Sequence, residues 1–129
     1  MLNVSFPTSQ DIYIELNGKR LAVVESYNAT STCDTHYVES FGEIEPIATI
    51  RGKIKHLIKL SRVYACENSS SSPINFYSLS NFNLIIIKNN KKIIYSGCEW
   101  SSISEGASLT NVAIENVSIV ATKRTEVFL

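Results

Sequence analysis

Hydrophobic and polar residues alternate along much of this chain with the two-residue period of β-strands. Near the N-terminus the apolar positions Ile12, Ile14 and Leu16 are separated by polar residues, and Asn17 and Gly18 follow directly. A second β-rich run begins after this pair. The pattern predicts a hairpin with a type I′ turn, because both central residues of that turn need positive φ and Asn-Gly adopts it readily.

The middle of the chain predicts two more strands around a projecting segment. The second run, from Leu21 to about Cys33, is long for a strand of a globular protein. Residues 34–52 contain acids, two glycines and Pro46, so we expect a loop or a projecting hairpin there. Alternation resumes over residues 53–66 and predicts a further long strand.

The strand predicted over residues 53–66 has two different faces. One face is expected to carry a largely apolar set: Ile54, His56, Ile58, Leu60, Arg62 and Tyr64. The other face carries a basic stripe of Lys53, Lys55 and Lys59.

The C-terminal half predicts a short helix and more strands. Residues 74–81 fit one short helix, and residues 82–98 fit a second hairpin around a lysine-rich turn. Residues 99–107 are expected to form a connection around the single tryptophan, and residues 109–122 a final long strand followed by a short tail. We therefore predict one mainly β domain over residues 1–129, an antiparallel barrel or sandwich of about six strands with one short flanking helix. The alternative is a mixed α+β domain with a helix at residues 36–45.

Composition changes this picture little, but the order of the charges adds to it. The chain has 12 basic and 12 acidic residues. Residues 1–50 hold seven acids and two bases, whereas residues 51–98 hold eight bases and one acid. An acidic front and a basic middle can pair within one fold or meet across copies of the protein. We expect no membrane contact, because no apolar run is long enough to span a bilayer.

Candidate chemistry is sparse. His36 and His56 are the only histidines, and Cys33, Cys66 and Cys98 are odd in number, widely spaced and most simply buried as small hydrophobic side chains. No glycine-rich phosphate loop or nucleophile motif is present. We expect no catalytic, cofactor-binding or metal-binding residue; a small enzyme that uses Cys33 and His36 is the weakest of three functional hypotheses.

The long strands are the informative anomaly. A strand of about 12 residues runs roughly 40 Å. That length exceeds what a domain of 129 residues needs to close its own core. Strands of this kind favour a subunit whose edges are completed by neighbouring chains.

The order of elements over residues 10–125 resembles a known family, on four segments: Val38–Ala48, Ile58–Tyr64, Phe82–Ile86 and Tyr95–Trp100. It is similar to the tail-tube proteins of contractile phages and of phage-tail-like particles, such as PBSX-type prophage particles and R-type bacteriocins including diffocin. The type VI secretion tube protein shares this fold.

This resemblance implies a structural subunit that forms homohexameric rings, which stack into the inner tube of a tail. Its partners would be copies of itself and the sheath and baseplate proteins, with or without DNA passing unspecifically through the lumen. The short segment before Asp11 leaves open whether it is the main tube protein or a baseplate-proximal initiator. It would lie in the bacterial cytoplasm during assembly and then in the virion or particle.

The resemblance also assigns candidate contact residues. The ring-stacking loop would use Val38, Glu39, Phe41, Glu43, Glu45 and Pro46. Candidates for the lateral or lumen strands are Lys53, Lys55, Lys59 and Glu115.

The second hypothesis is a standalone β-domain that binds a carbohydrate or a peptide. It predicts a monomer with a concave aromatic patch, for which the candidates are Tyr13, Tyr27, Tyr37 and Trp100.

Overall fold

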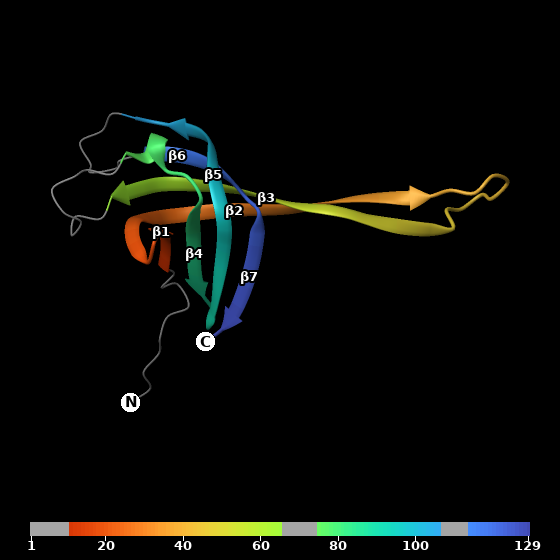
Figure 1. Cartoon of the computed structure of the whole chain (residues 1–129), viewed down its shortest axis with the longest axis horizontal. Coiled ribbons are helices and arrows are strands. Elements are labelled where there is room, and N and C mark those ends of the chain that lie inside the picture. The colour runs from red at the N-terminus through yellow and green to blue at the C-terminus, as the bar shows by residue number, and fades with distance from the viewer. Residues whose placement is uncertain (1–10, 66–74, 107–113) are drawn as a thin grey trace.

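The computed structural model describes residues 11–65, 75–106 and 114–129, and it confirms a mainly β, antiparallel fold. Instead of about six strands, these residues contain seven, joined in one sheet (Figure 1). The elements are β1 (Asp11–Leu16), β2 (Lys19–Val38), β3 (Ala48–Ala65), the 3₁₀ turn η1 (Phe76–Ser78), β4 (Phe82–Lys88), β5 (Lys91–Ser104), β6 (Ile114–Ala121) and β7 (Lys123–Phe128).

The strand pairings form a closed circuit. The order is β4-β1-β2-β3-β6-β5-β7, and β4 pairs in addition with β5. Six strands are thereby paired side by side in a ring. Strand β7 lies outside this circuit and pairs with residues 91–96 of β5, along the edge that β4 leaves free. We call these paired strands, without the projecting hairpin described below, the body.

Both hairpin turns predicted from the sequence are present. Asn17 and Gly18 have φ of 54° and 78°, as a type I′ turn requires. At the second turn Asn89 and Asn90 have φ of 51° and 60°. Asparagine tolerates this left-handed region because its short side chain can bond locally.

Two predictions for the C-terminal third were wrong. Residues 99–104 continue β5 through Trp100, where we expected a connection, because this half of β5 pairs with β6. The expected short tail is the strand β7, which pairs with residues 91–96 of β5. Thr122 bends the chain between β6 and β7, and its N–H donates to the Ser96 carbonyl at 3.1 Å, so both strands follow one edge of β5.

The helix predictions were also wrong. Within residues 75–81 only Phe76–Ser78 turn, as a 3₁₀ element capped by the Asn75 side chain, which accepts from the Tyr77 N–H at 3.1 Å. Leu79 is already extended and Asn81 has φ of 52°, so the turn cannot continue. The alternative helix at residues 36–45 is absent, because β2 continues to Val38 in register with Ala48 and a loop follows.

The core fills the inside of the strand circuit. Its largest fully buried side chains are Phe82, Ile58, Leu60, Leu84, Ile86, Ile119, Val63 and Cys98. On β3 the inward face changes at Arg62, whose φ of 56° interrupts the alternation. Val63 therefore faces the core, and the expectation that Arg62 and Tyr64 share a face with Leu60 was wrong.

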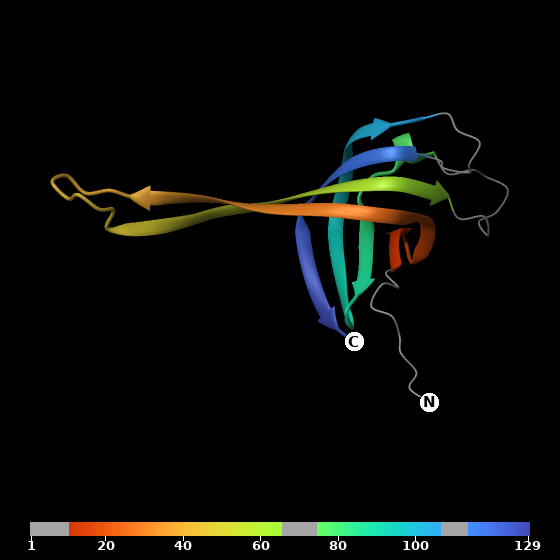
Figure 2. The ribbon, with the colours of Figure 1, turned by 180° about the vertical axis from the view of Figure 1, so that it is seen from behind.

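A two-stranded hairpin projects from the body, as Figures 1 and 2 show from opposite sides. We call it the arm and define it as residues 32–55. It comprises the distal part of β2, the tip loop of residues 39–47 and the start of β3. The pairing of β3 with β6 begins only at His56, so the arm lies beyond the reach of the other strands. The projecting hairpin expected over residues 34–52 is confirmed.

Candidate assembly interface

The arm exposes an unusual share of large apolar side chains. Among the described residues twelve large hydrophobic side chains are exposed, and six of them lie on the arm. These six are Tyr37, Phe41, Ile44, Ile47, Ile50 and Ile54. Contiguous exposed apolar surface marks an interaction site in most soluble proteins. A two-stranded hairpin is also only marginally stable by itself, so the arm is the part of the fold that gains most from a neighbour.

The apolar face of β3 continues from the core into the arm. Residues at even positions of this strand share a face from Ile54 to Leu60; beyond Ile54 the pairing with β2 shifts register by one residue, and after Leu60 Arg62 interrupts the alternation. Ile50, which is 57% exposed, lies beyond the register shift on the other face of the arm. Along the row itself Ile58 and Leu60 are buried, with exposed fractions of 0% and 1%, whereas Ile54 is 47% exposed. One row of side chains thus begins in the core and ends in solvent.

The tip loop combines carboxylates with apolar groups. Glu39, Glu43 and Glu45 lie in it with Phe41 and Ile44, whose side chains are fully exposed. The loop is closed by the Ile47 N–H, which donates to the Val38 carbonyl at 2.9 Å. Among the described residues no ion pair involves any of the three glutamates.

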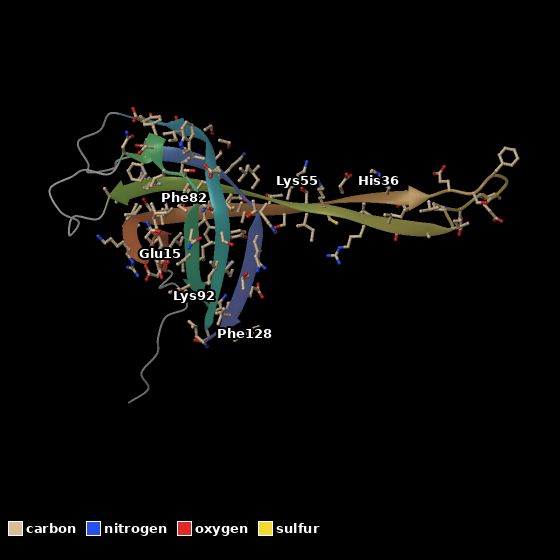
Figure 3. All side chains as sticks on the ribbon, viewed as in Figure 1. Glu15, His36, Lys55, Phe82, Lys92 and Phe128 are labelled. Carbon is tan, nitrogen blue, oxygen red and sulfur yellow. The ribbon has the colours of Figure 1, made fainter. Side chains whose placement is uncertain are left out.

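The structure divides the remaining candidate contact residues between arm and body. Val38 ends β2 at the base of the tip loop, and Pro46 lies within that loop. Lys53 and Lys55 lie on the arm, and both alternate with the apolar row of β3 (Figure 3 labels Lys55). Lys59 lies on the same strand within the body, in register with Asn28 and Ser118, and half-buried Glu115 lies on β6. Lys55 and Lys59 thus share one face of β3, whereas Glu115 lies on another strand.

A groove of about 610 Å³ opens where the arm leaves the body. We call it the basal groove. Its lining residues come from β2, β3, β4, β5 and β7: Tyr27, Ala29, Ser31, Ile54, His56, Lys88, Lys91, Ile93, Tyr95 and Arg124. Sequence reasoning missed this groove, because five strands separated along the chain build it. The one available signal was the lysine-rich turn of the second hairpin, residues 88–92.

The basal groove is basic and its cations are held in place. The Arg124 guanidinium donates to the Tyr95 hydroxyl at 3.2 Å and to the Glu126 carboxylate at 2.7 Å. Lys91 lies 3.4 Å from the same carboxylate. The bond from Arg124, followed by that from Lys91, holds the pKa of Glu126 below its ordinary value. The Lys88 ammonium lies 5.1 Å from the centre of the Tyr27 ring. Three cations thus face the groove with one carboxylate at its rim.

Aromatic rings and a histidine form the floor between these cations and the arm. The His56 and Tyr95 rings meet edge to face with centroids 5.8 Å apart. The Ser31 hydroxyl and His56 Nδ1 are 2.7 Å apart. These contacts fix the side chains that a docking partner would meet.

The structure does not assemble the site of the enzyme hypothesis. His36 pairs with Asp34, its Nε2 lying 3.2 Å from a carboxylate oxygen, and the Cys33 thiol donates to the Gly52 carbonyl at 3.7 Å. A hydrogen bond with Thr35 is the main cause that lowers the pKa of Cys33. Cys33 is exposed, contrary to our expectation, whereas Cys98 is buried as expected and Cys66 lies outside the described residues.

The aromatic patch of the binding-module hypothesis is not brought together either. Tyr13 is buried in β1, and Tyr37 lies at the far end of the arm. Trp100 packs beneath η1, where its indole N–H donates to the Tyr77 carbonyl at 3.1 Å. Of the four predicted residues only Tyr27 lines the basal groove.

No protein-family model matches this chain, and no curated protein matches it. The described ranges contain no helix long and apolar enough to cross a membrane. Within those ranges no group of three or more histidine, cysteine, aspartate or glutamate side chains is placed to hold a metal ion.

Proposed function

We propose that this chain is a structural subunit of a contractile phage-tail-like particle. It forms hexameric rings of the inner tail tube or of the baseplate-proximal initiator on which the tube grows. The body is the barrel of each subunit, and the arm makes the contact between subunits. The sheath and the baseplate are its other partners, and DNA passes through the lumen without specific binding where the particle carries it.

The observation that carries this proposal is the apolar row of β3. A core face that continues into solvent at Ile54 is left incomplete by its own chain. Burial of apolar surface contributes about 25 cal/mol per Å², so covering this row and the tip with a neighbour stabilises an assembly. Repeated in each copy, one such contact generates a ring or a tube.

The strand circuit supports the same conclusion. Pairing of β4 with both β1 and β5 leaves few free edges in the body, so uncontrolled edge-to-edge aggregation is limited. The exposed apolar side chains of the arm are then one surface left to associate, beside the outer edge of β7 with Val127 and Phe128. Controlled assembly through one projecting element is what a ring-forming subunit needs.

The test removes the arm and keeps the body. Ser31 and His56 are register partners, so residues 32–55 can be replaced by an Asn-Gly turn. We expect rings of the full chain in negative-stain images over a concentration series, and a folded monomer for the shortened variant. Circular dichroism checks that the shortened variant retains its sheet. A full chain that stays monomeric at every concentration, also under crowding by polyethylene glycol, would contradict the proposal.

The basal groove favours a second function, that of a binding module for a carbohydrate or peptide. Two tyrosines and three cations line a groove of about 610 Å³, which is large enough for a small ligand. This function predicts a monomeric full chain and binding that survives removal of the arm. A glycan array and calorimetry on the shortened variant would separate it from the first.

A further inference from the structure

We infer that the basal groove of one copy receives the tip loop of a second copy of this chain. The inference rests on the proposed assembly function and names the receiving surface that this function requires. It follows from three independent properties of the two surfaces: charge, apolar character and reach.

Charge makes the two surfaces complementary. The tip loop holds Glu39, Glu43 and Glu45 and no basic residue between positions 39 and 47. The groove presents Lys88, Lys91 and Arg124. Complementary potentials steer two surfaces together and fix their register.

Apolar chemistry and size agree with this pairing. Phe41 and Ile44 are the most exposed large apolar side chains among the described residues. The groove offers aromatic and aliphatic walls at Tyr27, Tyr95 and Ile93. An aromatic anchor in a pocket, ringed by charged pairs, is the usual centre of a protein interface.

Reach excludes self-docking. The arm carries the tip away from the body in both Figures 1 and 2, whereas the groove lies at the root of the arm. The seven residues of β2 beyond Ser31 place the tip at roughly 23 Å from the root at the rise of a strand. The tip of one copy therefore meets the groove of another copy.

The contact is head to tail. Each copy gives one tip and offers one groove, so the two surfaces differ and the interface repeats around a ring or along a helix. Each copy then has both surfaces occupied, and no unpaired tip remains in a closed ring.

Charge reversal tests this pairing. The tip variant carries Glu43→Lys and Glu45→Lys, and the groove variant carries Lys88→Glu and Lys91→Glu. We expect each variant alone to associate at least about tenfold more weakly than the wild type in sedimentation velocity. An equal mixture is expected to recover association to within about threefold, because each reversed tip meets a reversed groove and each native tip a native groove.

Two controls carry the same kinds of charge reversal elsewhere, one substitution each. Glu15→Lys lies in β1 and Lys92→Glu on the side of β5 away from the groove; both residues are labelled in Figure 3. Both controls should associate like the wild type. Circular dichroism confirms that every variant retains its fold.

A photocrosslinking benzophenone side chain in place of Phe41 gives a second readout. We expect intermolecular products that map by mass spectrometry to the groove residues. The inference would be overturned if the wild type associated while the mixture of the two variants stayed dissociated. It would also be overturned if the crosslinked products mapped to another surface. Either result would leave the assembly function standing. A monomeric wild type without any intermolecular product would overturn both.

Discussion

Strands β2 and β3 run through both the body and the arm, yet their side chains meet different surroundings in the two regions. In the body half of β3 the row of Ile58 and Leu60 is covered by the other strands of the circuit, whereas in the arm Ile54 and Ile50 face water. From Leu60 to Ile54 the alternation of residues does not change. What changes is the number of neighbours: the arm has only its partner strand.

This difference separates stability from assembly. The body contains the buried apolar set and therefore the stabilisation that folds the chain. The arm buries little within its own chain and adds little to that stability. Substitutions in the body should act on unfolding, and substitutions in the arm on association.

The largest contrast is expected in the reactivity of the two described cysteines. The thiolate is the reactive form, and burial raises the pKa of Cys98 to about 12, whereas Thr35 lowers that of the exposed Cys33 on the arm. At a given pH the thiolate of Cys33 should be more abundant by a factor of at least about 10³. Iodoacetamide labelling followed by peptide mapping should modify Cys33 quickly and Cys98 only on unfolding. Equal rates in the folded chain would mean that this part of the core opens freely.

The next contrast lies within the single row of β3. Ile58→Ala should lower the free energy of unfolding by about 2–5 kcal/mol, because it leaves a cavity in the core. Ile54→Ala, four residues along the same face, should cost less than about 0.5 kcal/mol. Urea unfolding measures the free energy of unfolding of both variants. In sedimentation velocity, under conditions where both variants remain folded, only Ile54→Ala should associate more weakly than the wild type. An unfolding cost at Ile54 close to that at Ile58 would show that the arm is covered within its own chain.

Much of the fold could be predicted from local sequence patterns. The alternation of residues and two short turns predicted both tight hairpins. The segment that contains Gly and Pro predicted the projecting hairpin, which is the arm. The errors arose where pairing with a distant strand decided the structure. The mostly polar residues 123–128 form a strand because β5 offers them a free edge, and no local pattern contains that information.

The candidate interface could be predicted only in part. The tip loop is continuous in sequence, so its acids and Phe41 were visible as one segment. The basal groove joins Tyr27, Tyr95 and Arg124 across nearly a hundred residues, and only the register of five strands brings them together.

Two glycines offer a smaller version of the same contrast. Gly97 in the body has φ of 63°, and a Cβ there would collide with the Thr122 side chain, which bonds to Ser96. Gly97→Ala should therefore cost about 1–3 kcal/mol of unfolding free energy. Gly52 lies on the arm, where a Cβ would collide with the Asp34 carbonyl. Gly52→Ala should distort the arm and weaken association while the melting temperature stays nearly unchanged. A large loss of melting temperature for Gly52→Ala would tie the arm to the folding of the body.

The smallest effect concerns two acids, one on each region. Because its folded pKa is lowered by Arg124 and Lys91, Glu126 stabilises the body above its unfolded pKa, and this contribution is lost as the pH falls through the lowered value. The melting temperature of Glu126→Gln should lie slightly below that of the wild type at neutral pH, and the two should converge in acid. Asp34→Asn removes an exposed pair with His36 on the arm and should change no melting temperature, since exposed pairs contribute little. Added salt should reduce the Glu126 difference by screening. A difference that persists in acid would instead show that Glu126 stabilises β7 by packing rather than by charge.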